Sequence, residues 1–301
     1  GRPDLFAAND TQPNRLYQNK GDGTFTDVAV AAGVAFNEAG VARAGMGVDA
    51  ADYDGSGRES LVIGNFSNEM MALYSNEGDG LFIDEAPGST IGRASMLRLT
   101  FAAFFFDVDL DGWLDILGYN GHVADDIAAV QPTIAYPEAP HLFRNVGGQK
   151  FEEWSRRVGS AFSAPVVGRG AAYGDFDTDG DLDLLLMANN GPARLLRNDG
   201  GTNQSLRITL SGSSSNRDAI GAKARLLRDG GPTPWRTVKT GSSYLSQSEL
   251  PLTFGLGAAA KVSGVEVVWP NGRTERVSGV AAGSAVTIQE GKGITRTAPL
   301  R

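Results

Sequence analysis

Five aspartates lie within nine residues of the stretch GDFDTDGDLDLLLMANN, residues 174–190. They are Asp175, Asp177, Asp179, Asp181 and Asp183. A regular strand would place all five side chains on one face of a sheet, where like charges repel one another. The sequence therefore predicts either a sharp bend in the chain or a bound cation at this point.

Two further acidic loops lie upstream and share this pattern. We call the three the Asp52 loop (DYDGSGRES, 52–60), the Asp107 loop (DVDLDGWLD, 107–115) and the Asp175 loop (DFDTDGDLD, 175–183), and number their positions 1 to 9. An apolar run follows each loop. The spacing D-x-D-x-D-G-x-x-D resembles the first nine positions of a calcium loop, and calcium prefers six to eight oxygen ligands.

The predicted calcium ligands follow from this numbering. In the Asp107 loop they are the side chains of Asp107, Asp109, Asp111 and Asp115 and the backbone carbonyl of Trp113. In the Asp175 loop they are the side chains of Asp175, Asp177, Asp179 and Asp183 and the carbonyl of Asp181. The glycine at position 6 permits the sharp turn that folds these groups around an ion.

The Asp52 loop is a weaker candidate. It has serine at positions 5 and 9 and a glycine, Gly55, at position 4. Asp52, Asp54 and Ser56 could hold a third ion, or the loop is a degenerate copy without one. None of the loops is an EF-hand, since Gly118 and Leu186 stand where a bidentate glutamate would be needed. Magnesium demands stricter octahedral geometry, so calcium is predicted at about two sites; solvated acidic turns are the alternative.

An internal repeat contains these loops. Position 9 is Ser60, Asp115 and Asp183 in successive copies, 55 and 68 residues apart, and a phrase that contains an (L/F)xxN turn recurs along the chain. The phrases are LYQNKGDGTF (16–25), LYSNEGDGLF (73–82), LFRNVGGQKF (142–151) and LLRNDGG (195–201). Short β-rich runs between Gly, Asn and Asp turns, at this period, predict four-stranded propeller blades.

The first residues extend the repeat. Gly1-Arg2-Pro3-Asp4 aligns with positions 6 to 9 of the Asp107 loop, so the chain is expected to begin inside an acidic loop. Residues 1–204 are therefore predicted to form about three to four blades of an N-terminally truncated β-propeller, of which the first is incomplete.

Charge divides the 301 residues into two parts. Residues 1–204 carry a net charge of −15 and residues 205–301 a net charge of +7, within a total of −8. The acidic part would repel nucleic acid, and the basic part has no dense Lys/Arg cluster. Cysteine is absent, which excludes disulfides and thiolate sites, and no apolar run reaches the length of a membrane span.

Residues 205–301 predict a small β-sandwich-like domain. SLRITLSG, AKARLLRD, VEVVWP and SAVTIQE alternate or run apolar, and Asn271-Gly272 indicates a hairpin modified by Pro270. The expected fold class is thus all-β, a partial propeller followed by this second domain.

Two sets of phrases carry a family resemblance. The acidic loops, the GDGxF phrases and AGVARAGMGVDAADYDG resemble FG-GAP/VCBS-type propeller repeats over about residues 1–204. SNRDAIGAKARL, GSSYLSQSEL, LTFGLG and VEVVWPNGRTERV resemble the ASPIC/UnbV domain that follows such repeats in cartilage acidic protein-like proteins and their bacterial relatives. The resemblance implies a calcium-binding, exported propeller located outside the cell, in the periplasm or in the cell envelope.

Function is predicted to be non-enzymatic, namely binding of a protein or glycan partner through propeller loops, including the long segment 121–140. The alternative is a hydrolase or lyase acting on polysaccharide, in which His122 works with Asp125 and Asp126. His141, the second histidine, is expected to open a strand. A third possibility is a structural module whose propeller only presents the C-terminal domain.

Overall fold

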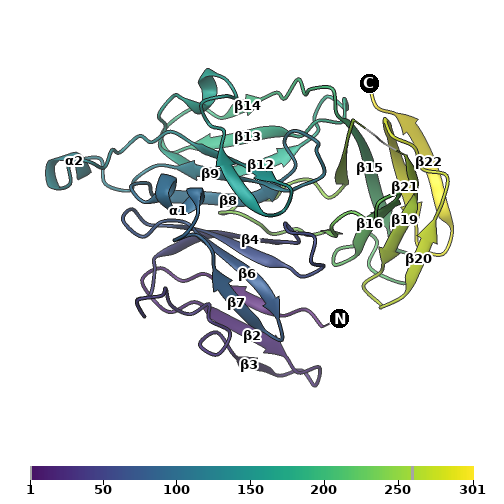
Figure 1. Ribbon diagram of the computed structural model, residues 1–301, viewed down its shortest axis with the longest axis horizontal. Coiled ribbons are helices and arrows are strands. Elements are labelled where there is room, and N and C mark those ends of the chain that lie inside the picture. Colours follow the sequence, from purple (N-terminus) through teal and green to yellow (C-terminus); the bar gives the residue numbers. More distant parts are fainter. Residues whose placement is uncertain (1, 259–260) are drawn as a thin grey trace.

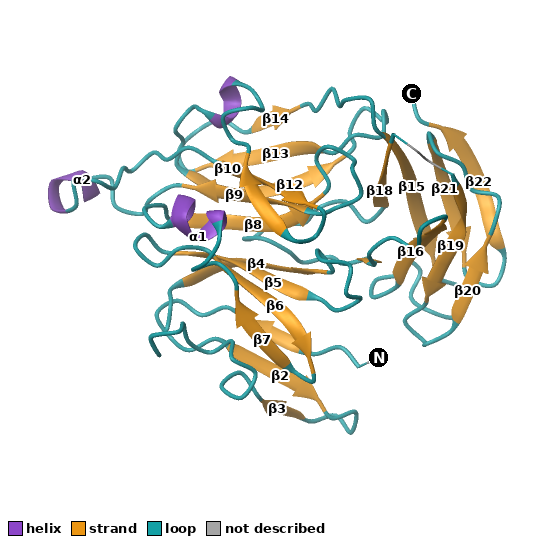
Figure 2. Cartoon of the chain, in the orientation of Figure 1, coloured by secondary structure: helices purple, strands orange, loops and turns teal. Residues whose placement is uncertain are grey.

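The computed structural model describes residues 2–258 and 261–301, so Gly1 of the predicted first loop lies outside the described residues. In these residues the strands form six sheets, and only short helical segments interrupt them (Figure 2). The expected all-β class is confirmed.

Four of the sheets fan out side by side as blades of an incomplete propeller (Figure 1). The first blade has β1 (Leu5–Ala7), β2 (Arg15–Asn19) and β3 (Phe25–Asp27). The second has β4 (Gly45–Ala51), β5 (Ser60–Asn65), β6 (Ala72–Gly78) and β7 (Leu81–Asp84). The third has β8 (Thr100–Phe106), β9 (Asp115–Asn120), β10 (His141–Val146) and β11 (Lys150–Glu153). The fourth has β12 (Gly168–Gly174), β13 (Asp183–Ala188) and β14 (Arg194–Leu196).

Strand register is the same in the last three blades and places each acidic loop at an equivalent point. The residue before position 1 pairs with position 9 in every case, as Ala51 with Ser60, Phe106 with Asp115 and Gly174 with Asp183. Each loop therefore joins the first strand of a blade to the second. Position 9 also begins the second strand, which fixes its side chain relative to the loop.

Apolar side chains on both faces of each blade hold the blades together. Phe105 packs into the core shared with the second blade, and Phe104 into the core shared with the fourth, because neighbouring strand residues face opposite sides. Both are almost fully buried, which stabilises the fold by roughly 1.5–3 kcal/mol for each side chain. The three consecutive phenylalanines are thus core residues.

Short helices occur only in the connections between these strands. They are α1 (Thr90–Ser95), α2 (Ile127–Val130) and a 3₁₀ segment (Ser160–Phe162). α2 lies inside the long segment 121–140 and projects from the propeller at the left of Figure 1. Over the described residues, none of the helices has the length and apolar character needed to span a membrane.

The C-terminal strands form two four-stranded sheets that face one another (Figure 1). One sheet has the order β18 (Leu252–Gly257), β15 (Gln204–Ser211), β21 (Ser284–Gln289) and β22 (Gly293–Pro299). The other has the order β17 (Arg236–Thr237), β16 (Lys223–Arg228), β19 (Val262–Val268) and β20 (Thr274–Val277). A single core containing Leu206, Leu226 and Trp269 lies between them. We call this unit the C-terminal sandwich.

Candidate metal centre

The three acidic loops share one backbone conformation. Positions 4 and 6 have positive φ in each loop, a conformation that is strained for most side chains and free for glycine. The values are 76° and 83° for Gly55 and Gly57, 56° and 97° for Leu110 and Gly112, and 67° and 99° for Thr178 and Gly180. In the sequence, Gly55 departs from the pattern of the other two loops. In the structure, it suits the conformation that all three loops adopt.

Position 1 has one carboxylate oxygen engaged by its own loop and one left free. Asp107 Oδ2 accepts a hydrogen bond from the Gly112 N–H at 3.1 Å, and Asp175 Oδ2 accepts one from the Gly180 N–H at 3.1 Å. Oδ1 of each aspartate is buried and has no hydrogen-bond partner among the described residues. A buried carboxylate oxygen is costly without a donor or a cation, so both loops present an unmet ligand atom.

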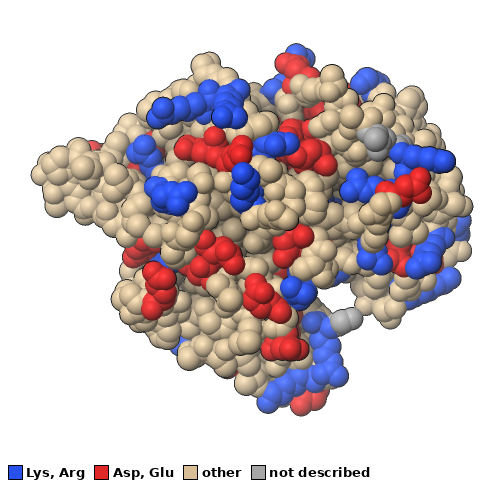
Figure 3. Space-filling model, viewed as in Figure 1, with Lys and Arg blue, Asp and Glu red and all other residues tan. Residues whose placement is uncertain are grey.

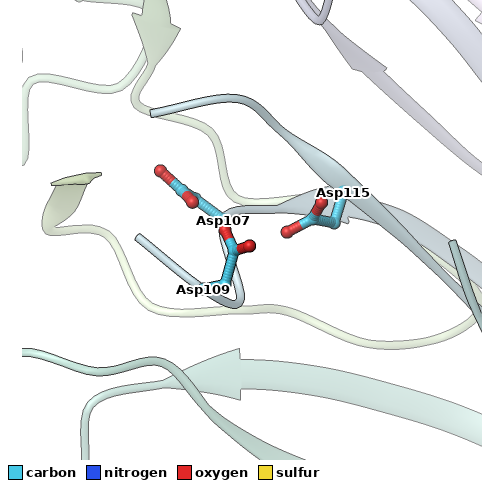
Figure 4. Close-up of side chains that lie close together, drawn as sticks. All are labelled: Asp107, Asp109 and Asp115. Atoms are coloured by element: carbon cyan, nitrogen blue, oxygen red, sulfur yellow. The ribbon is translucent and has the colours of Figure 1, made fainter. Parts of the chain in front are cut away.

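Positions 3 and 9 bring further carboxylates to the same place. One oxygen from each of Asp107, Asp109 and Asp115 lies within 4.8 Å of the other two, and Asp175, Asp177 and Asp183 form an equivalent group. Figure 4 shows Asp107 and Asp109 on the loop and Asp115 on the adjoining strand. Three hard oxygen donors around one point match the donor preference of calcium.

Hydrogen bonds hold the position 9 carboxylates in place. Asp115 accepts from the N–H groups of Val108, at 2.9 Å, and Asn145, at 2.8 Å. Asp183 accepts in the same way from the N–H groups of Phe176, at 3.0 Å, and Asn198, at 2.8 Å. These bonds orient each carboxylate before any ion binds.

Position 5 does not join either carboxylate group. Arg144 donates to Asp111 Oδ2 at 2.6 Å and to Asp109 Oδ2 at 2.5 Å, so one guanidinium binds the carboxylate at position 5 and the one at position 3. Asp179 accepts from the N–H of Asp181 at 2.9 Å. The structure thus brings together three of the four side chains that the sequence proposed for each loop.

Position 7 was expected to contribute only a backbone carbonyl. Trp113 and Asp181 are both half-buried, and their side chains lie beside Gly148 and Gly200, respectively. Neither side chain is part of a carboxylate group, so the backbone carbonyl at position 7 stays a prediction.

The Asp52 loop lacks a free ligand oxygen at position 1. Asp52 Oδ1 accepts from the Gly57 N–H at 3.2 Å, and Oδ2 accepts from the Trp235 N–H at 2.9 Å. Asp54 accepts from the N–H of Ser56 at 3.0 Å, and position 9 is a serine. With both oxygens of Asp52 engaged, this loop is the weakest of the three as an ion site.

Burial makes ionisation of several of these carboxyls unfavourable. It raises the pKa of Asp107 to about 7, although the nearby Arg236 acts in the opposite direction. Burial also raises the pKa of Asp115 well above its ordinary value, and the charge of Asp107 adds to this. In the Asp175 loop, burial and the charge of Asp179 raise the pKa of Asp181 to about 6. A bound divalent cation would favour the ionised forms.

The repeated asparagine has a structural role that its place in the phrases alone did not predict. Its N–H donates to position 9, and its side-chain amide donates to the carbonyl at position 8 of the same blade. For Asn145 the latter bond reaches Leu114 O at 3.0 Å, and a second reaches Tyr53 O of the preceding blade at 3.0 Å. Asn198 donates in the same way to Val108 O at 2.8 Å. The repeated phrase could have revealed this link, since asparagine was its one invariant polar residue.

The proposed catalytic group is not assembled. His122 is buried, its Nδ1 accepts from the Ala124 N–H at 3.0 Å, and burial lowers its pKa. Asp125 and Asp126 are exposed, and no hydrogen bond or ion pair within the described part of the chain joins them to His122. His141 begins β10, as expected, and lies 3.1 Å from Glu153 Oε1.

Two family models match the chain. Residues 1–63 match the FG-GAP-like repeat, and residues 212–295 match the model described as ASPIC and UnbV. Both resemblances inferred from the sequence are therefore confirmed over these residues.

Curated relatives extend this similarity over most of the chain. Cartilage acidic protein 1 of Xenopus tropicalis is 30% identical over 278 residues, which are 90% of this chain and 40% of that protein. The Homo sapiens protein of the same name is 30% identical over 276 residues, 90% of this chain and 39% of its own. The chain thus spans well under half the length of these relatives.

A solved structure of an Agrocybe aegerita lectin, titled for its recognition of non-reducing terminal N-acetylglucosamine, also aligns with the chain. It covers 93% of this chain and 76% of its own at 18% identity, with a TM-score of 0.39.

Proposed function

We propose that this protein is a non-enzymatic, calcium-stabilised binding or scaffold protein that acts outside the cytoplasm. Its chain joins an FG-GAP-like repeat to an ASPIC and UnbV region. The observation that carries the calcium proposal is the pair of equivalent carboxylate groups in the Asp107 and Asp175 loops. Each has a buried aspartate oxygen without a partner among the described residues. Two independent loops with the same unmet ligand atom favour ion binding over two solvated turns.

Calcium would act on stability in this proposal. Asp107, Asp109 and Asp115 would hold one ion, and Asp175, Asp177 and Asp183 the other. When bound, the cation neutralises carboxylates that otherwise repel, and a ligand that binds only the folded state stabilises it by mass action. The chain's own residues pre-orient the site through the backbone bonds to positions 1 and 9.

Partner recognition is assigned to the propeller loops, because loops on a rigid scaffold commonly carry binding residues. The segment 121–140 is the longest connection between blade strands and projects from the propeller (Figure 1). A protein or a glycan is the proposed partner. Dispersal of His122, Asp125 and Asp126 gives the polysaccharide-cleaving alternative no support from geometry.

Calorimetry of calcium binding tests the proposal, together with thermal melts in calcium and in chelator. We expect about two sites and a higher melting temperature in calcium. The double variant Asp109→Ala, Asp177→Ala removes one carboxylate from each group and should lose both effects. Asp22→Ala, in the exposed turn before β3, is the matched control and should retain them. Melts that are equal in calcium and chelator would show the loops to be solvated turns.

A further inference from the structure

The acidic loops face the C-terminal sandwich, and the sandwich contacts position 1 of each. The Trp235 N–H donates to Asp52 Oδ2 at 2.9 Å, and the Gly255 N–H donates to Asp107 Oδ2 at 3.2 Å. At the third loop, Arg207 Nη1 lies 2.8 Å from Asp175 Oδ2 in a buried ion pair. The same aspartate that offers a free oxygen to an ion thus uses its other oxygen to contact the second domain.

Backbone carbonyls of the two complete loops also bind the sandwich, at the same two positions. At position 4, Leu110 O accepts from the Gly257 N–H at 2.9 Å, and Thr178 O accepts from the Arg301 N–H at 2.9 Å. At position 6, Gly112 O accepts from Arg236 Nη2 at 3.1 Å, and Gly180 O accepts from Ser205 Oγ at 2.9 Å. These are the positions of positive φ, so the contacts exist only while the loop keeps its curved shape.

Arg236 places a buried positive charge close to the Asp107 loop. It is buried, and its Nη2 lies 3.9 Å from Asp107 Oδ2. Its Nε and Nη1 have no hydrogen-bond partner in residues 2–258 and 261–301. A buried guanidinium destabilises the fold unless nearby groups compensate it, so the bond to Gly112 O and the charge of Asp107 matter for holding the sandwich in place.

A second anchor contacts the strands of the blades directly. Residues 239–250 leave the sandwich and run between the first strands of the blades. Ser243 pairs with Val48 of β4, and the Tyr244 ring packs on Phe101 of β8 with centroids 4.8 Å apart. Ser248 Oγ accepts from the Tyr173 N–H of β12 at 3.1 Å. This inserted segment would keep the domains together even where a loop contact is lost.

We propose that the Asp107 and Asp175 loops form a cation-dependent seat for the C-terminal sandwich. The ion that draws the carboxylates at positions 1, 3 and 9 together also fixes the carbonyls at positions 4 and 6 that the sandwich binds. This inference rests on the proposed calcium sites. Because coupling is reciprocal, the docked sandwich also tightens ion binding in both loops.

Hydrogen exchange of the full chain in saturating calcium, measured by mass spectrometry, tests this proposal for each loop separately. Asp109→Ala should speed exchange in peptide 250–258, which contacts the Asp107 loop, and leave peptide 296–301 unchanged. Asp177→Ala should do the reverse. We expect about a fivefold change or more, the lower end of ordinary coupling. Equal changes in both peptides, or none, would overturn the proposal.

Two controls separate the seat from other effects. Arg144→Met keeps every ligand carboxylate but removes the ion pair that Asp109→Ala also breaks, so it should leave peptide 250–258 unchanged. If it speeds exchange there as much as Asp109→Ala does, the ion pair and not the ion holds the seat. Calorimetry on the same samples distinguishes the two proposals. Without calcium binding the proposed function fails, whereas calcium binding with unchanged exchange overturns only the seat.

Discussion

Asn145 shows how a single side chain can join two blades. Its amide spans Leu114 O in its own blade and Tyr53 O in the preceding one, its Oδ1 accepts from the Gly148 N–H, and the residue is fully buried. Asn19 holds the equivalent place in the first blade, where its amide reaches Pro3 O. Asn19 is partly exposed, and no bond from it to another blade is present in the described residues.

We expect Asn145→Ala to lower the free energy of unfolding by about 2–4 kcal/mol, because it leaves two buried carbonyls without donors. Asn19→Ala should lower it by less than about 1 kcal/mol. Urea denaturation in calcium measures both variants. Similar losses for the two would mean that the bond between blades contributes little.

Glu138 predicts a pH dependence that is separate from the acidic loops. Its Oε2 accepts from the Leu99 N–H at 3.0 Å, and burial raises its pKa from 4.5 to about 7. A carboxyl whose pKa is raised on folding contributes its full stability below about pH 4.5 and loses it as the pH rises through about 7. Glu138→Gln should remove this loss, on the order of 3 kcal/mol by pH 8. The test is to measure the unfolding free energies of the wild type and of Glu138→Gln between pH 5 and 8 in calcium. Parallel dependences of the two free energies on pH would contradict the role of Glu138.

At the scale of elements, the turn between β15 and β16 depends on one carboxylate from beyond β21. Glu290 accepts hydrogen bonds from the N–H groups of Ser213, Ser214 and Ser215 at 2.7–2.9 Å and also from Asn271. The backbone bonds lower the pKa of Glu290 to about 2. A carboxylate that accepts several N–H bonds in this way is stabilised in its ionised form.

We expect Glu290→Gln to lower the melting temperature at neutral pH, because the amide cannot accept as strongly from three N–H groups. The contribution of Glu290 is present above about pH 4.5 and is lost as the pH falls through about 2. The difference between wild type and variant should therefore shrink in acid. Melts at pH 7 and pH 2.5 measure it, and a constant difference would argue against the charged hydrogen bonds as its cause.

At the scale of the whole molecule, the two parts of the chain differ in charge, and the propeller blades differ in how completely their faces are covered. On the face in Figure 3, acidic side chains are spread over the lower blades, and basic ones lie over the C-terminal sandwich at the right and also over the upper blades. Leu185 in β13 has the same repeat position as Leu117 in β9. Leu117 is 0% exposed between blades, whereas Leu185 is 45% exposed beside a groove of about 310 Å³.

We expect the same substitution, leucine to glutamine, to change stability strongly at Leu117 and little at Leu185. Leu117→Gln places a polar group in a closed core and should destabilise the protein by about 3–5 kcal/mol. Leu185→Gln should change the unfolding free energy by less than about 1 kcal/mol and reduce self-association at high concentration. Denaturation and analytical ultracentrifugation test this pair. An equal loss of stability would show that the face bearing Leu185 is covered in solution.

The sequence by itself determined the repeat, the all-β class, the sandwich and the carboxylates at positions 1, 3 and 9. These features are local: a nine-residue loop between two paired strands has few conformations, and alternation decides which strand residues share a face. The family resemblance likewise depended on contiguous phrases such as VEVVWPNGRTERV.

Only the tertiary structure decided which predicted ligands remain available. Asp111 lies outside the carboxylate group and is paired with Arg144, 33 residues away, and the second oxygen of Asp52 accepts from the Trp235 N–H, 183 residues away. These outcomes depend on how separate blades and the C-terminal sandwich pack, and no local spacing encodes a contact whose partners the chain brings together from such distances.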